Sequence, residues 1–193
     1  PVFETVLGKL KYSITLAVSS VFLIYLISLP LGIWSAVRQG TIADKLVTFI
    51  LFMLYSLPSF FVAVILLNLL TVGEWAVFPN IGFHSDNYDD LTTLEYIKDV
   101  LWHVSLPIVC MSYGGLAALS RYARTGLLDV IRADYIRTAR AKGLPEGVVI
   151  IKHAARNGMI PIITLMATLL PVLVGGSVII EVIFGIPGMG SYV

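Results

Sequence analysis

The chain has 193 residues, of which 58% are hydrophobic and only 13% are charged, and its mean hydropathy is +0.90. Soluble domains carry about 25% charged residues, so this composition excludes an ordinary soluble protein and indicates one embedded in a bilayer. The net charge of +1 says little as a total, because the distribution of Lys and Arg between loops carries the information in a membrane protein.

Four apolar segments are predicted to span the membrane as helices, at residues 13–36, 46–72, 104–124 and 159–184. The first carries no charge and would reach about 36 Å as a helix, enough for a hydrocarbon core of about 30 Å. The third is expected to continue helically past Arg121 and Arg124, whose side chains would reach water as topology anchors. Prolines inside these segments are tolerated in membranes; they are Pro30, Pro58, Pro107, Pro161 and Pro171.

The charges separate between the connections. Residues 73–103 hold six acidic side chains against Lys98 alone, whereas residues 121–156 hold eight Lys or Arg side chains against three acidic ones. The positive-inside rule then places residues 132–157 in the cytoplasm and residues 73–103 outside. Within the outer loop, "LTTLEYIKDVLWHV" has apolar positions at helical spacing and predicts a helix lying on the membrane interface.

The cytoplasmic loop 132–157 has internal structure as well as charge. From Arg132, "RADYIRTARAKG" predicts a helix of about three turns that ends at Gly143 as the C′ residue. Pro145 and Glu146 suit the first turn of a second helix that runs to about Arg156. The first helix would have an apolar face of Tyr135, Ile136 and Ala139. In the second helix, four side chains would point toward the next span: Val148, Val149, Ile151 and Lys152. We call this pair of short helices the knob; its apolar stripe flanked by Arg suits docking into a groove on a soluble partner.

No catalytic, cofactor-binding or metal-binding motif is found in the sequence. It lacks H-E-x-x-H, a complete G-x-S-x-G and any Walker-type phosphate loop. His84, His103 and His153 lie in separate segments, which does not favour a metal site. The pairs Gly114-Gly115 and Gly175-Gly176 are more typical of close helix packing than of a gate.

Glu181 is the ionisable residue of the fourth predicted span. A carboxylate buried in lipid would cost about 2.5 to 3.5 kcal/mol on insertion scales, so its side chain is expected to face water or protein. Two roles stay open for it at this point: a translocation path, or a solvated outer vestibule.

"DYIRTARAKGL", followed by "HAARN", Pro161 and "GGSVIIEVIFGIPGMG", resembles the permease subunits of binding-protein-dependent ABC importers, in the dipeptide/oligopeptide branch. The likeness covers nearly the whole chain, including "YSLPSFFVAVILL" and "HVSLPIV". The general importer motif E-A-A-x-x-x-G lacks its Glu here, because Arg137 stands at that position, and the downstream Pro is also absent. R-T-A-R-A-K-G at this place is similar to the peptide branch, and an ion pair made by the family's Glu is not carried over.

The resemblance implies an all-α polytopic bundle of the type I importer permease kind, with four of six spans present and the first and last spans absent. It implies that the knob is the coupling segment for a cytoplasmic ATPase, with the coupling residues Asp134, Tyr135, Arg137, Thr138, Ala139, Arg140, Ala141, Gly143 and Leu144. Among these, Tyr135, Ala139 and Gly143 would make the docking contact with the ATPase, and the neighbouring Arg residues would orient the approach by their charge.

The implied partners are a second permease subunit forming a heterodimer, two cytoplasmic ATPase subunits that bind the ATP and Mg, and an extracytoplasmic solute-binding protein. The chain itself would hold no cofactor, would lie in the inner (cytoplasmic) membrane and would bind no nucleic acid. Peptides are the expected cargo, with nickel or glycosides as alternatives within the same importer class.

Two other classes of protein stay open at this stage. A secondary transporter driven by an ion gradient would need ionisable residues within its spans, and residues 13–36 and 46–72 have none. A membrane enzyme would need a convergent polar site, which the sequence does not reveal. Because Pro1 replaces an initial Met and "GIPGMGSYV" ends after a turn, we also expect both ends of a longer chain to be missing.

Overall fold

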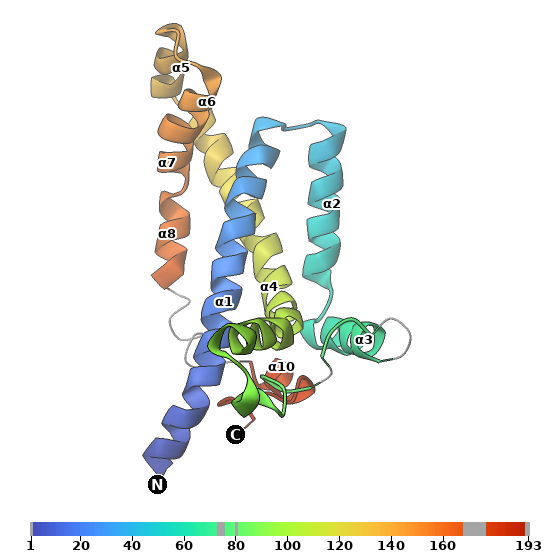
Figure 1. Ribbon diagram of the computed structural model, residues 1–193. Coiled ribbons are helices and arrows are strands. Elements are labelled where there is room, and N and C mark those ends of the chain that lie inside the picture. Colours follow the sequence, from blue (N-terminus) through green and yellow to red (C-terminus); the bar gives the residue numbers. More distant parts are fainter. Residues whose placement is uncertain (1, 73–75, 80, 168–176, 192–193) are drawn as a thin grey trace. The chain divides into compact units, whose positions relative to one another are not determined.

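The computed structural model describes residues 2–72, 76–79, 81–167 and 177–191 (Figure 1). Every regular element in this part is a helix, which confirms the predicted all-α class. In chain order they are α1 (Val2–Val37), α2 (Ile42–Ser56), α3 (Ser59–Thr71), the short 3-10 helix η1 (Tyr88–Asp90), α4 (Thr93–Ile131), α5 (Asp134–Ala141), α6 (Glu146–Val148), the π-helix η2 (Val149–Ala155), α7 (Arg156–Gly158), α8 (Ile160–Ala167) and α10 (Val178–Ile183).

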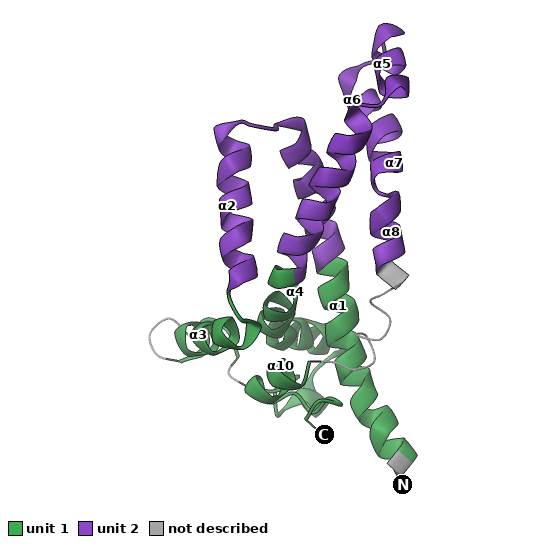
Figure 2. Ribbon diagram, turned by 180° about the vertical axis from the view of Figure 1, so that it is seen from behind, with its two compact units in different colours: residues 1–23, 57–114, 170–193 green, residues 24–56, 115–169 purple. Residues whose placement is uncertain are grey.

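The chain divides into two compact units (Figure 2). Unit 1 comprises residues 1–23, 57–114 and 170–193, and unit 2 comprises residues 24–56 and 115–169. The long helices α1 and α4 each contribute residues to both units. Unit 2 contains the whole of the knob.

Unit 1 has a core of apolar side chains from α1, α3, α4 and α10. Leu16, Ala63 and Ile180 are at most 1% exposed in it, and Cys110 of α4 is also 1% exposed. Aromatic pairs extend this core into the segment before α4: Tyr12 packs edge-on against Phe83, and Phe78 stacks on Trp102. Within α4, His103 lies beside Asp99, and its Nδ1 is 2.8 Å from the Asp99 backbone oxygen.

Unit 2 brings its helices together through small residues. A Cβ added to Gly32 of α1 would lie 2.5 Å from the Ala123 Cβ of α4, and one added to Gly126 would lie 2.6 Å from the Gly158 oxygen of α7. Helices associate in membranes through such close contacts, because lipid gives them no hydrophobic drive to pack against one another. Figure 1 shows α5 and α6 folded against each other beyond the end of α4, with the chain returning through α7 and α8.

Two predicted elements differ in the structure. The "LTTLEYIKDVLWHV" segment is helical from Thr93 as predicted, but it is the first part of α4, which runs without interruption to Ile131 and includes Pro107. The predicted span 46–72 is broken into α2 and α3 at Leu57 and Pro58. Pro58 has the extended backbone of an N-cap (φ −64°, ψ 137°), and the residue before a proline is disfavoured in a helix, so α3 starts anew.

By length and hydropathy, α1 and α4 are each able to cross a membrane, and α2 with α3 would count as a third span if the broken pair is one crossing. That result concerns the described residues only. Of the predicted span 159–184, the structure describes α8 and α10; Pro171, Gly175 and Gly176 lie outside the described residues.

Candidate functional site

The first arm of the knob is α5, which ends at Ala141 and has Gly143 as its C′ residue, as predicted. Gly143 has φ +75°, a left-handed conformation that glycine adopts without steric cost. Its N–H donates to the Arg140 oxygen at 2.9 Å, and the Leu144 N–H donates to the Ala139 oxygen at 3.4 Å. These two bonds form a Schellman motif, which satisfies the last carbonyls of the helix and fixes the direction in which the chain leaves it.

The second arm begins after Pro145, which stands at the N-cap of α6 rather than inside its first turn. The chain then forms the π-helix η2 over Val149–Ala155 before α7. A π-helix accommodates an extra residue, and such bulges are frequent at functional sites. The extra residue changes which side chains face inward: Val149 and Ile150 are buried, while Ile151 is 70% exposed. The predicted inward set Val148, Val149, Ile151 and Lys152 is therefore wrong except at Val149.

The two arms pack on each other through a small apolar core. Ile136 is fully buried and Ala139 is 8% exposed, and both pack with Val149, Ile150 and Ala154 and with Leu127 at the end of α4. Ala139 thus faces the inside of the knob in this structure. We predicted that Ala139 contacts the ATPase. The structure corrects this, because the Ala139 methyl group is buried between the two arms and cannot meet a partner.

The remaining predicted coupling residues lie at the surface of the knob. Tyr135 is 45% exposed, and its hydroxyl accepts a hydrogen bond of 3.1 Å from the Asn157 amide of α7. This bond joins "DYIRTARAKGL" to "HAARN", two of the motifs on which the resemblance rests. The other exposed members of the set are Asp134, Arg137, Thr138, Arg140, Ala141, Gly143 and Leu144.

An ion pair spans the turn between the arms. The Arg140 Nη2 lies 2.6 Å from Glu146 Oε1, and its Nε lies 3.1 Å from Oε2. The hydrogen bond from Arg140 lowers the pKa of the Glu146 carboxyl. The pair therefore stabilises the turn fully above the unfolded Glu pKa of about 4.3, and this contribution is lost as the pH falls through the lowered pKa. Because both side chains are exposed, the contribution is small.

A second ion pair, which the sequence analysis missed, joins three helices of unit 2. Arg124 of α4 donates to both oxygens of Asp44 in α2, at 3.1 and 2.9 Å. Asp44 also accepts from the Gly40 N–H at 3.0 Å and from the Ser35 hydroxyl of α1. Asp44 is 2% exposed. Arg124 is thus not only a topology anchor; the signal available in the sequence was Asp44 itself, the one acidic residue of the 38–45 connection.

Glu181 faces protein and not water. It is 0% exposed in unit 1, and its two oxygens accept hydrogen bonds from the Ser13 hydroxyl (2.8 Å) and the Gly190 N–H (2.7 Å). The Ser13 oxygen in turn accepts from the Met189 N–H at 2.8 Å. Neither a water-lined path nor a solvated vestibule describes this position. The carboxylate instead holds the Gly-rich segment after α10 against α1.

Removing the Ser13 hydroxyl is expected to destabilise unit 1 measurably. Ser13→Ala leaves a Glu181 oxygen and the Met189 N–H without partners in a buried place, which costs about 1–3 kcal/mol. Ser20 is a matched control, because it lies on the same helix, is 3% exposed and has a hydroxyl without a partner among the described residues. Thermal unfolding of the purified protein should show a lower midpoint for S13A and no loss for S20A; equal effects would contradict this role.

Comparison with known proteins is consistent with a transport role. Residues 28–193 match the family described as "Binding-protein-dependent transport system inner membrane component". The chain belongs to this family. It is therefore related to the membrane-spanning permease components of ABC importers.

Several curated relatives of this permease carry peptide transport in their names. It is 38% identical over 192 residues to the oligopeptide transport system permease protein AppB of Bacillus subtilis, covering 99% of this chain and 58% of the relative. It is 32% identical over 208 residues to the dipeptide transport system permease protein DppB of Escherichia coli K12, covering 100% and 61%. The inner membrane ABC transporter permease protein YejB of Escherichia coli O157:H7 is 37% identical over 191 residues, covering 98% and 52%. The chain thus spans between half and two thirds of these relatives.

Proposed function

We propose that this chain forms part of one permease subunit of an ATP-driven importer that takes up di- or oligopeptides delivered by an extracytoplasmic solute-binding protein. The observation that carries the proposal is the knob, a self-packed pair of short helices with an exposed basic surface between α4 and α8. The names of AppB and DppB support peptides as the cargo. The family's description supports the binding protein and the inner membrane.

In this proposal the permease contributes no chemistry of its own. Two partner ATPase subunits bind ATP and Mg in the cytoplasm, and a second permease completes the translocation path. The knob transmits their movement because its two arms cannot shift independently: the buried contacts of Ile136 and Ala139, the Schellman turn and the Tyr135–Asn157 hydrogen bond make it one rigid body. Tyr135, Arg137, Arg140 and Gly143 are among the exposed residues of the knob that would meet the ATPase.

Uptake by the reconstituted transporter tests this function. Proteoliposomes with both permeases, both ATPases and the binding protein should accumulate a labelled dipeptide or oligopeptide when ATP and Mg are supplied on the ATPase side, and should stop when ATP is removed. Uptake that survives without ATP but disappears with the ion gradient would instead indicate a secondary transporter. Uptake of nickel or a glycoside in place of peptides would support an ABC importer but contradict peptides as its cargo.

A further inference from the structure

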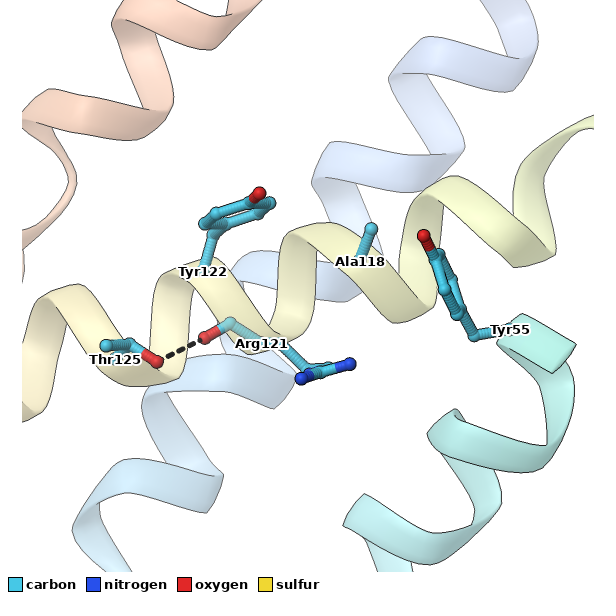
Figure 3. Close-up of a pocket in the computed structure, with 5 residues that line it drawn as sticks. All are labelled: Tyr55, Ala118, Arg121, Tyr122 and Thr125. Atoms are coloured by element: carbon cyan, nitrogen blue, oxygen red, sulfur yellow. Dashed lines mark hydrogen bonds between the residues drawn. The ribbon is translucent and has the colours of Figure 1, made fainter.

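A hollow lies on α4 in unit 2, outside the knob. It has a volume of about 280 Å³ and is lined by Tyr55 of α2 and by Ala118, Arg121, Tyr122 and Thr125 of α4 (Figure 3). A second hollow of about 220 Å³ shares Arg121 and Thr125 with the first and is also lined by Ser120. Arg121 therefore borders both spaces.

Arg121 carries a positive charge that no acidic group balances in the part of the chain that the structure describes. The ion pair of Arg124, one turn along α4, uses Asp44 fully, whereas Arg121 forms no ion pair there. The only described contact of its guanidinium is with the face of the Phe52 ring, at 5.9 Å. Arg121 is exposed in this chain, as a cation in a spanning helix must be unless it faces an anion, and cations so placed mark substrate or ion pathways.

Residues with hydroxyl groups line the two hollows that Arg121 borders. The Ser120 hydroxyl is buried, with the residue 2% exposed, and it has no hydrogen-bond partner among the described residues. Tyr55 and Tyr122 line the first hollow from α2 and α4 (Figure 3). Thr125 donates its proton to the Arg121 backbone oxygen at 3.0 Å. A buried hydroxyl without a hydrogen-bond partner is unusual, because buried polar groups are nearly always satisfied.

We propose that these two hollows, which share Arg121, form a subsite of the translocation path that binds a carboxylate, namely the C-terminal carboxylate of the peptide cargo. The guanidinium offers a planar fork that fits a carboxylate in a bidentate way, and the Ser120 hydroxyl supplies a further donor. This inference rests on the proposed peptide import. It adds that the permease itself distinguishes a free peptide acid from its amide.

The test compares uptake of one peptide as the free acid and as the C-terminal amide in proteoliposomes of the complete transporter with saturating binding protein. The binding protein is the same throughout, so the change in the acid-to-amide ratio between variants reports on the permease. Arg121→Gln should lower this ratio roughly tenfold, as expected for losing hydrogen bonds to a charged group. Ser120→Ala removes only an unpartnered hydroxyl and should lower the ratio about threefold without disturbing assembly.

Arg38→Gln is the matched control, because it removes an exposed positive charge that does not line either hollow. Its ratio should equal that of the wild type. An unchanged ratio in both R121Q and S120A would overturn the proposal while wild-type uptake still supports peptide import. Losses in R121Q that affect acid and amide equally and follow the anionic lipid content of the vesicles would also overturn it and assign the hollow to a lipid phosphate. Failure of wild-type uptake would instead contradict the proposed function.

Discussion

Gly143→Val is expected to uncouple ATP hydrolysis from uptake. Gly143 has φ +75°, where a residue with a side chain is strained by about 1–2 kcal/mol and a β-branched one by more. A Cβ added at this position would meet no atom within 4 Å, so the strain lies in the backbone conformation. Relief of this strain would break the Schellman turn and separate the motions of the two arms. We expect the amount of peptide taken up per ATP hydrolysed to fall about fivefold or more.

Two controls separate the turn from the surface. Gly147→Val places the same side chain in the same loop, again with no atom within 4 Å, but its backbone has no positive φ. Gly143→Asn keeps a residue that tolerates the left-handed conformation. Both should retain coupling, as measured by uptake and phosphate release in the same proteoliposomes. Normal coupling in G143V would refute the role of the turn, and a matching loss in G147V would assign the effect to bulk at the surface.

Breaking the Asp44–Arg124 pair is expected to cost about 2–4 kcal/mol of the free energy of unfolding, because each single change leaves a partly or fully buried charge uncompensated. Asp44→Asn should unbalance Arg124, and Arg124→Gln should leave the Asp44 carboxylate, which is 2% exposed, without its cation. The double variant D44N/R124Q removes both charges and leaves neither unpaired. Its loss of stability should therefore be smaller than the sum of the losses of the two single variants.

The wild type, D44N, R124Q and the double variant form a double-mutant cycle. Their thermal unfolding in the same detergent measures the coupling free energy between Asp44 and Arg124. Arg137→Gln is the reference for an exposed pair, since its partner lies 3.8 Å away and the Arg137 side chain is 79% exposed. We expect R137Q to change stability by less than about 0.5 kcal/mol. Strict additivity of D44N and R124Q would show that the pair does not hold the three helices together.

Local rules predicted the parts of the knob that depend on neighbouring residues. Gly143 as a C′ residue and a helical turn after Pro145 follow from backbone sterics alone, and the structure has both, although Pro145 lies one position earlier than expected. Face assignments were less successful, because they depend on what the helix packs against. Ile136 and Ala139 turn inward and Tyr135 turns outward, and the π-helix moves Ile150 inward in place of Ile151. No residue pattern signals that extra residue.

The partners of the buried charges could not be predicted from the sequence, for a different reason. Asp44 and Arg124 are 80 positions apart, and the rules for membrane charges treat each cation alone, as an anchor that reaches water. Glu181 and Ser13 are 168 positions apart, and a hydroxyl gives no hydropathy signal that it will bind a carboxylate. In both cases the sequence indicated that the charge needed a partner, but not which residue would provide it.

Cys110 is the only cysteine in these 193 residues, and it is 1% exposed in the core of unit 1. The native thiol is therefore shielded from labelling reagents while the protein is folded. A cysteine introduced at an exposed position such as Lys142, beside the Gly143 turn, would be the one reactive thiol of this region. A fluorophore or spin label attached there would report the movement of the knob directly during an ATP cycle, without first removing a natural cysteine from this segment.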